Sequence, residues 1–275
     1  MRILTIANLA IAIDSVLLLT LAQCGGNSGL PADASADSKA SGTVGQYTLI
    51  DDMEGTISPN GPVLLPISGA GLAPGYWGSW YSTGSTSNII SPNPFTYVAL
   101  SSPHPTMDGV TSLHATHLTC SISDLYGFCT ESFWPAQHAV PDLTPGSDPG
   151  LSRVPYDVSA YHGVVFWGMS SKANRVKVMF NNADTDPVAG RCGQSDASAV
   201  QCWDAFSKYV TLTDTWQRYE VKFKDLLQEG WGFAPANGKF DPTTIYSIGF
   251  QVNGPQTDGA PTIEADYWID DLYFE

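Results

Sequence analysis

Apolar and polar side chains alternate with a period of two in several segments of this sequence. Residues 219–224 read YEVKFK, residues 175–180 read RVKVMF, and residues 246–253 read YSIGFQVN. Successive side chains of a β-strand point to opposite faces, so this alternation is typical of strands that bury one face and expose the other. The pattern therefore predicts an all-β fold.

Turn-forming residues separate these strand-like segments. The 275 residues include 26 Gly and 19 Pro, and 43% are hydrophobic, which is enough for a packed core. Only KDLLQEG, at 224–230, suggests a helical turn. So many short strands favour a two-sheet antiparallel β-sandwich of the jelly-roll type. The predicted strands are Tyr47–Asp51, Trp77–Ser82, Thr96–Leu100, Ser112–Thr119, Gly163–Met169, Arg175–Phe180, Tyr209–Thr213, Trp216–Lys224, Ile245–Val252 and Ala265–Phe274.

Residues 1–24 differ in composition from the rest of the chain. One basic residue, Arg2, precedes a mostly apolar run that ends at Cys24. This segment resembles a bacterial export signal. Its last four residues, LAQC, resemble a lipobox, which implies that Cys24 is lipidated; ordinary signal cleavage is the alternative. We expect an exported protein, either anchored to a bacterial membrane or secreted.

A segment of small and polar residues follows. Residues 25–46 read GGNSGLPADASADSKASGTVGQ, a composition typical of a flexible linker. Residues 47–275 form the predicted jelly-roll domain, and no apolar run in them is long enough to span a bilayer. We expect a monomer that contacts a membrane only through an N-terminal lipid.

Four cysteines remain in the predicted domain, in two close pairs. Cys120 and Cys129 form one pair, and Cys192 and Cys202 the other. Three connectivities are possible, and the local one, Cys120–Cys129 with Cys192–Cys202, is our prediction.

The chain is strongly acidic, with 12 basic and 27 acidic residues and a formal net charge of −15. Such a chain repels a phosphate backbone, so nucleic acid is excluded as a partner. The surplus carboxylates are available to bind a divalent cation.

Several segments, in their order and spacing, resemble a known family. They are LIDDMEG at 49–55, GYWGSWYS at 75–82, FDPTTIYSIGFQV at 240–252 and YWIDDLYF at 267–274, with further matching segments in 156–232. Together they resemble the galactose-binding-like jelly rolls, and among these the family-11-type carbohydrate-binding modules of bacterial secreted proteins. The resemblance implies non-catalytic binding of a polysaccharide or surface glycan.

The same resemblance implies a structural Ca²⁺ ion, held by carboxylates of the first and last strands. Calcium takes roughly six to eight oxygen ligands. Glu54 with Asp270 is the predicted pair, and Asp271 is the reserve. Adjacent side chains of a regular strand point to opposite faces, so at most one of the two aspartates is expected to bind the ion. The alternative is a solvated or hydrogen-bonded strand edge.

A glycan site combines aromatic faces with side chains that hydrogen-bond hydroxyl groups. We expect either Trp80 or Tyr81 to face the ligand while the other packs inside. A core position is the alternative for each aromatic residue, and a merely solvated strand is the alternative for the polar ones. The predicted ligand-binding residues are Trp80, Tyr81, Trp134, Arg175, Trp231, Gln251 and Asn253.

Common catalytic motifs are absent from the sequence. It has no G-x-S-x-G turn, no H-E-x-x-H helix, no Walker A motif and no dinucleotide fingerprint. Two carboxylates in one cleft would instead indicate a sandwich-fold glycoside hydrolase or polysaccharide lyase. A structural or adhesin-type surface protein is the third hypothesis. Non-catalytic glycan binding is the function that we predict.

Overall fold

The computed structural model describes most of the chain beyond residue 42. The described ranges are 43–44, 47–54, 63–64, 76–85, 90–92, 95–107, 109–137, 152–153, 155–172, 174–186, 202–233, 235 and 237–275. Residues 1–42, with the predicted export signal, Cys24 and most of the predicted linker, lie outside these ranges. No helix in the described ranges is long and apolar enough to cross a membrane.

The described residues form strands and two single-turn 3₁₀ helices, η3 (Phe223–Asp225) and η4 (Pro242–Thr244). The all-β prediction is therefore confirmed. Two residues inside the predicted linker, Thr43–Val44, pair with the next strand as β1.

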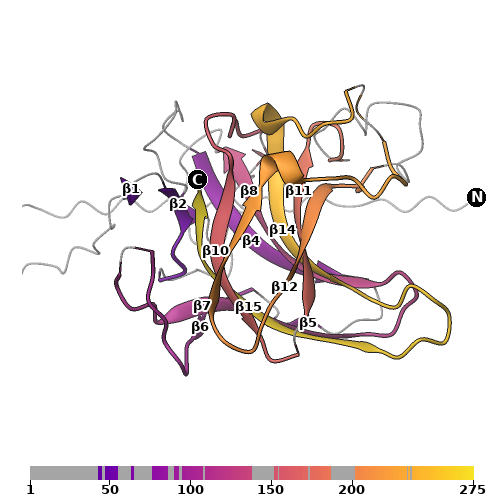
Figure 1. Cartoon of the computed structure of the whole chain (residues 1–275), viewed down its shortest axis with the longest axis horizontal. Coiled ribbons are helices and arrows are strands. Elements are labelled where there is room, and N and C mark those ends of the chain that lie inside the picture. Colours follow the sequence, from indigo (N-terminus) through magenta and orange to yellow (C-terminus); the bar gives the residue numbers. More distant parts are fainter. Residues whose placement is uncertain are drawn as a thin grey trace, which may run out of the picture. The chain divides into compact units, whose positions relative to one another are not determined.

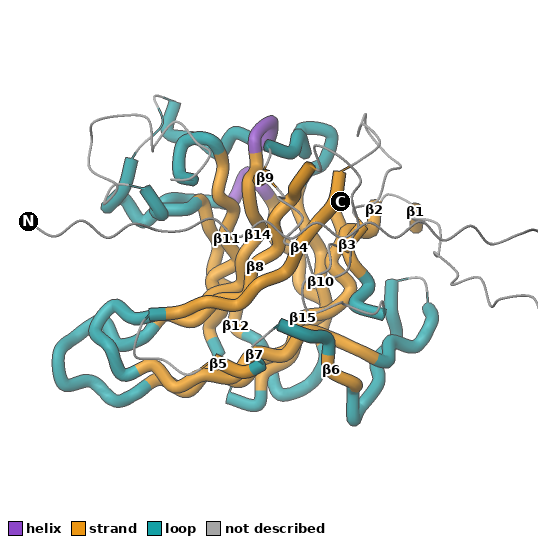
Figure 2. Tube along the Cα trace, turned by 180° about the vertical axis from the view of Figure 1, so that it is seen from behind, coloured by secondary structure: helices purple, strands orange, loops and turns teal. Residues whose placement is uncertain are grey.

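The strands are arranged in two antiparallel sheets (Figures 1 and 2). The first sheet runs β1-β2-β15-β10-β13, and β7 pairs with β15, β5 and β6. Its strands are β1, β2 (Tyr47–Asp51), β5 (Ile90–Ser91), β6 (Val98–Ala99), β7 (His114–Ile122), β10 (Gly163–Ser170), β13 (Gln217–Lys222) and β15 (Ile263–Phe274).

The second sheet runs β12-β11-β14-β8-β4-β3, and β9 pairs with β8. Its strands are β3 (Val63–Leu64), β4 (Tyr76–Gly84), β8 (Phe128–Gln137), β9 (Ser152–Arg153), β11 (Arg175–Asn182), β12 (Phe206–Thr211) and β14 (Ile245–Asn253). The sequence did not predict β8, although this strand lies between β14 and β4 in the sheet.

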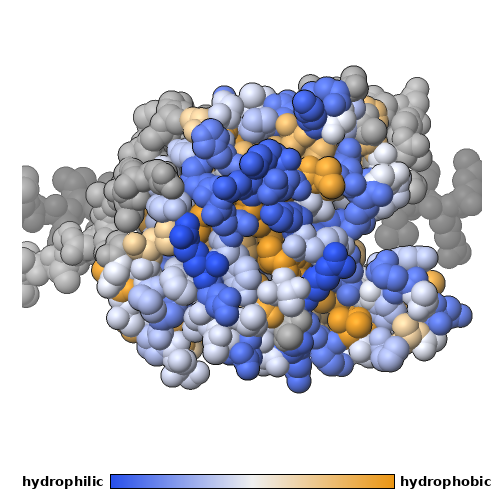
Figure 3. Space-filling model, in the orientation of Figure 1, coloured by the Kyte–Doolittle hydropathy of each residue, from blue (hydrophilic) through white to orange (hydrophobic). Residues whose placement is uncertain are grey.

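The hydrophobic core lies between the two sheets. Phe166 of β10 and Phe250 of β14 meet edge to face, with ring centroids 5.0 Å apart. The hydroxyl of Tyr267, on β15, donates to the carbonyl oxygen of Phe250 at 2.6 Å. These contacts across the layers confirm the β-sandwich. On the face shown in Figure 3, hydrophobic residues are scattered among hydrophilic ones, and no continuous hydrophobic area covers it.

One of the two predicted disulfides is present in the described residues. Cys120 of β7 is bonded to Cys129 of β8, which confirms that pairing. Because β7 and β8 belong to different sheets, the bond connects the two layers. Cys202 is also disulfide-bonded, and Cys192, its predicted partner, lies outside the described residues.

Candidate functional site

The second sheet carries a groove of about 1210 Å³ on the face turned away from the core. Along β8, Cys129, Glu131 and Phe133 are buried on the core side, whereas Thr130 and Ser132 belong to the groove, as strand alternation requires. The described lining consists of Tyr81, Ser82, Thr83, Tyr126, Phe128, Thr130, Ser132, Trp134, Lys177, Met179, Asn181, Trp203, Glu229, Trp231, Gln251, Asn253 and Gln256.

Aromatic side chains provide apolar surface in this groove. Tyr81 of β4 and Trp134 of β8 contact each other edge to face, with centroids 5.7 Å apart. Trp203 and Trp231, in the loops before β12 and after η3, are 52% and 53% exposed. Rigid aromatic faces of this kind are suited to packing against a ligand.

A salt bridge lies beside these aromatic residues. Lys177 Nζ lies 3.1 Å from Glu229 Oε1. The same carboxylate accepts hydrogen bonds from the Tyr209 hydroxyl at 2.7 Å and from Trp231 Nε1 at 3.0 Å. Burial opposes ionisation of Glu229, but these donors outweigh it and lower its pKa. The pair brings one positive and one negative charge to the groove, so it adds no net charge.

Two amide side chains extend this network along β14. Asn253 Nδ2 donates to the Tyr209 hydroxyl at 2.8 Å, and Gln251 Nε2 donates to Asn253 Oδ1 at 2.5 Å. Burial, followed by the hydrogen bond to Glu229, raises the pKa of Tyr209, so this hydroxyl stays protonated. The groove thus offers fixed amide, hydroxyl and ammonium groups next to its aromatic faces.

A buried aspartate positions one rim of the groove. The carboxylate of Asp204 accepts hydrogen bonds from the backbone N–H groups of Glu229 at 2.9 Å, Gly230 at 2.8 Å and Gly232 at 3.0 Å. Its neighbour in the chain is Trp203. Asp204 therefore holds together the two loops that carry Trp203 and Trp231.

We expect Asp204→Ala to loosen this rim, because three backbone N–H groups lose their acceptor. The loss of stability should be about 1–3 kcal/mol. Amide hydrogen exchange at residues 229–232 should speed up. Asp225→Ala is the matched control, since Asp225 is exposed and forms a surface salt bridge with Lys208. Unchanged exchange at 229–232 in Asp204→Ala would contradict the role of this carboxylate.

The structure places five of the seven predicted ligand-binding residues in the groove lining and the other two outside it. Trp80 is 7% exposed and lies in the core, because it occupies the core-facing position of β4 next to Tyr81. Arg175 begins β11, and its guanidinium lies over the ring of Tyr209, 3.9 Å from the centroid, outside the groove lining. The five residues in the lining are Tyr81, Trp134, Trp231, Gln251 and Asn253.

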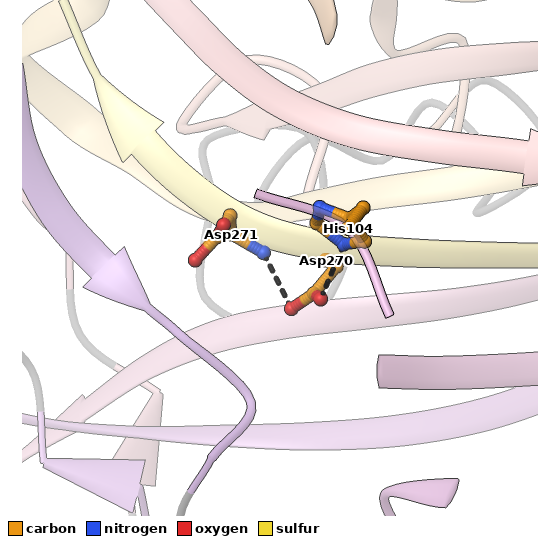
Figure 4. A group of neighbouring side chains, drawn as sticks. All are labelled: His104, Asp270 and Asp271. Carbon is orange, nitrogen blue, oxygen red and sulfur yellow. Dashed lines mark hydrogen bonds and ion pairs between the residues drawn. The ribbon is translucent and has the colours of Figure 1, made fainter. Parts of the chain in front are cut away.

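A second polar site lies at the predicted metal position, on the first sheet (Figure 4). It contains His104, Asp270 and Asp271, all buried, with possible ligand atoms within 4.8 Å of one another. The sequence did not single out His104 for this site. The prediction that the two aspartates point to opposite faces is wrong. Asp271 has a φ of +49°. The register of β15 shifts against β10 between Asp270 and Tyr273, and against β2 between Leu272 and Tyr273.

Glu54 does not belong to this three-residue cluster. Its carboxylate accepts hydrogen bonds from the backbone N–H groups of Leu113 at 2.5 Å and His114 at 3.0 Å, and from Ser112 Oγ at 2.9 Å. Burial opposes its ionisation, but these donors outweigh it and lower its pKa. Glu54 therefore acts as a hydrogen-bond acceptor for residues 112–114.

The residues around Asp270 fit the predicted calcium ion poorly. Calcium binds oxygen ligands, whereas His104 places an imidazole nitrogen, Nε2, 2.8 Å from Asp270 Oδ2. The oxygens of Glu54 already accept hydrogen bonds from neighbouring N–H groups. The site has a different donor set from the one predicted.

No protein-family model matches the sequence, and no curated protein does. Among solved structures, the chain is similar to the family 11 carbohydrate-binding module of the cellulosomal cellulase Lic26A-Cel5E of Clostridium thermocellum. The TM-score is 0.48 and the identity 14%, over 83% of this chain and 93% of that chain.

Two further structures were solved with bound oligosaccharides. A family 11 module from Clostridium thermocellum, in complex with a β-1,3-1,4-mixed-linked tetrasaccharide, matches with a TM-score of 0.48 and 14% identity, over 83% of this chain and 94% of that one. TmCBM61, in complex with β-1,4-galactotriose, gives a TM-score of 0.30 and 14% identity, over 71% and 87%. These are similarities of fold at low identity, and they identify no residue of this chain as a ligand contact.

Proposed function

We propose that this protein binds a polysaccharide in the groove of the second sheet without cleaving it. The observation that carries the proposal is the combination of Tyr81, Trp134, Trp203 and Trp231 with a fixed polar network in one groove. Aromatic faces pack against the C–H surfaces of sugar rings, and the amide and hydroxyl groups satisfy their hydroxyls. The groove volume of about 1210 Å³ exceeds the roughly 300–1,000 Å³ of small-molecule pockets, so several sugar units fit.

The carboxylates of the groove favour binding over cleavage. Glycosidases use two carboxyl groups about 5–10 Å apart, one of them with a raised pKa. Within the described lining, Glu229 is the one carboxylate, and it is held by Lys177, Tyr209 and Trp231 with a lowered pKa. This arrangement supports the binding function over the alternative of a hydrolase or lyase.

The charge of the protein favours a neutral glycan. The Lys177–Glu229 pair leaves the described lining without net charge, and the whole chain carries −15. A uronate-rich polysaccharide would be repelled by that field. Export through residues 1–24, with or without a lipid at Cys24, would bring the groove to glycans outside the cytoplasm.

Pull-down with insoluble neutral polysaccharides, and affinity electrophoresis with soluble ones, test this function. Tyr81→Ala, Trp134→Ala and Trp231→Ala should each weaken binding by about 10–30-fold, the effect of truncating an aromatic anchor at an interface. Trp268→Ala is the matched control. This half-exposed tryptophan of the first sheet stacks on His117, with centroids 3.9 Å apart.

Three results would count against the proposal. Loss of binding in Trp268→Ala alone would move the site to the other sheet. Release of soluble sugars would favour an enzyme. Absence of binding to every glycan tested would favour a structural surface protein.

A further inference from the structure

We infer that the buried cluster of His104, Asp270 and Asp271 binds zinc, in place of the calcium ion that the sequence predicted. This inference concerns the first sheet and does not depend on glycan binding by the second. It follows from the orientation of one histidine ring, from a count of hydrogen atoms, and from the identity of the ligand atoms.

The ring of His104 has a fixed orientation. Its Nδ1 lies 3.0 Å from the backbone carbonyl oxygen of Pro105, which can only accept, so Nδ1 carries the hydrogen. In the neutral ring, Nε2 then presents a lone pair, and it lies 2.8 Å from Asp270 Oδ2. Histidines that bind zinc through one ring nitrogen usually donate the other N–H to a carbonyl or carboxylate in this way.

A neutral His104 leaves no hydrogen atom between its Nε2 and Asp270 Oδ2, although other donors reach this carboxylate. The backbone N–H of Asp271 donates to Asp270 Oδ1 at 2.7 Å. Ser112 Oγ lies 2.5 Å from Asp270 Oδ2, 2.9 Å from Glu54 Oε1 and 3.0 Å from the carbonyl oxygen of His114. Glu54 Oε1 already accepts from two backbone N–H groups, so the single Ser112 hydrogen is available to Asp270 Oδ2. That hydrogen does not lie between Asp270 and His104. In the described part of the chain, no lysine or arginine forms an ion pair with Asp270. A buried carboxylate in this setting needs a cation or an added proton.

The positions of the three side chains suit a small ion. Zinc bonds of about 2.0–2.2 Å place neighbouring tetrahedral ligands about 3.4 Å apart. The ligand atoms of His104, Asp270 and Asp271 lie within 4.8 Å of one another, so modest side-chain rotations would bring them onto one ion. The positive φ of Asp271, +49°, places its carboxylate in the cluster.

The ligand types distinguish zinc from calcium. Imidazole nitrogen with carboxylate oxygen is a usual zinc set, whereas calcium prefers oxygen ligands alone. Two carboxylates and a neutral imidazole balance the charge of a divalent ion. Trp167 and Trp216 pack against His104, with ring centroids 5.0 and 4.3 Å away, which shields the site from water.

Metal titration of the tag-free full-length chain tests the inference. After dialysis against a chelator, the protein is titrated with zinc chloride or calcium chloride and its melting temperature is measured. We expect one zinc per chain and a larger rise in melting temperature with zinc than with calcium at equal concentration. Cobalt(II) added to the stripped protein should give the visible absorption bands of a tetrahedral site.

His104→Gln should weaken zinc binding by about 100-fold or more and remove the cobalt bands. The matched control is His117→Gln, because His117 also pairs with an aspartate, Asp266, but lies outside the cluster. Asp271→Asn is the second variant should His104→Gln fail to fold. A stronger response to calcium than to zinc, equal loss of zinc binding in His117→Gln, or no metal binding by the wild-type protein would each overturn the inference.

Discussion

Replacing Trp80 by alanine is expected to lower the free energy of unfolding by about 3–5 kcal/mol, as for other large core aromatic residues. Trp80 stacks on Phe95, with centroids 5.7 Å apart, and meets Phe133 edge to face at 5.4 Å. Its Nε1 also donates to Asp51 Oδ2 at 2.7 Å. The substitution therefore leaves a cavity and removes a donor from a buried carboxylate.

Tyr81→Ala is the matched variant, because the two residues are adjacent on β4 but face opposite sides. Its loss of stability should be about 1 kcal/mol or less, while its loss of glycan binding should be large. Urea unfolding of both variants, followed by tryptophan fluorescence, measures the difference. If the two variants lost the same stability, or if Tyr81→Ala still bound glycan like the wild type, the placement of Trp80 in the core and Tyr81 in the groove would be wrong.

The second large effect is a dependence of stability on pH that comes from Glu131. This residue of β8 is fully buried on the core side, and burial raises its pKa from 4.5 to about 8. Thr116 Oγ1 lies 2.9 Å from Glu131 Oε1 and 3.1 Å from the carbonyl oxygen of Ile269. The single hydroxyl hydrogen satisfies both contacts only if a protonated Glu131 donates to Thr116, which then donates to Ile269.

Stability falls as the pH rises because the folded protein binds one more proton than the unfolded chain. Between pH 4.5 and about 8 the folded protein keeps the proton on Glu131 and the unfolded chain loses it. The contribution of Glu131 to stability should thus be full below pH 4.5, fall by about 5 kcal/mol as the pH rises to 8, and then level off. Glu131→Gln should remove this fall, because glutamine stays neutral.

Unfolding of both proteins in urea at several pH values measures this difference. Burial also raises the pKa of Asp51, to about 6. Asp51 therefore lowers the stability of both proteins as the pH rises, and its effect cancels when the two are compared. Glu264→Gln, at an exposed position of β15, is the control and should behave like the wild type. A Glu131→Gln variant with the same pH dependence as the wild type would show that Glu131 is ionised in the fold.

Strand alternation predicted much of the fold and the floor of the groove. Gln251 and Asn253 were placed on the polar side of their strand by period alone, and they lie in the groove. The same rule could not decide between Trp80 and Tyr81, since two adjacent aromatic residues break the alternation. It also missed β8, where Glu131 and Pro135 are residues that strands usually avoid.

The groove rim and the cluster of His104, Asp270 and Asp271 depend on contacts that leave no periodic pattern in the sequence. Asp204 binds backbone N–H groups of residues 229–232, and any sequence there could offer them. Glu229 lay in a segment that was expected to be a helical turn. At Asp271 the expectation failed for a local reason, because its positive φ departs from regular strand geometry.

The disulfide between Cys120 and Cys129 has a mechanical consequence for the groove. It joins β7 of the first sheet to β8 of the second, so the layers are locked against sliding past each other at the end near the 123–127 turn. Because β8 also forms part of the groove floor, the floor behaves as a rigid platform. Adjustment to the thickness of a bound chain then falls to the two rim loops, which the hydrogen bonds of Asp204 connect to each other.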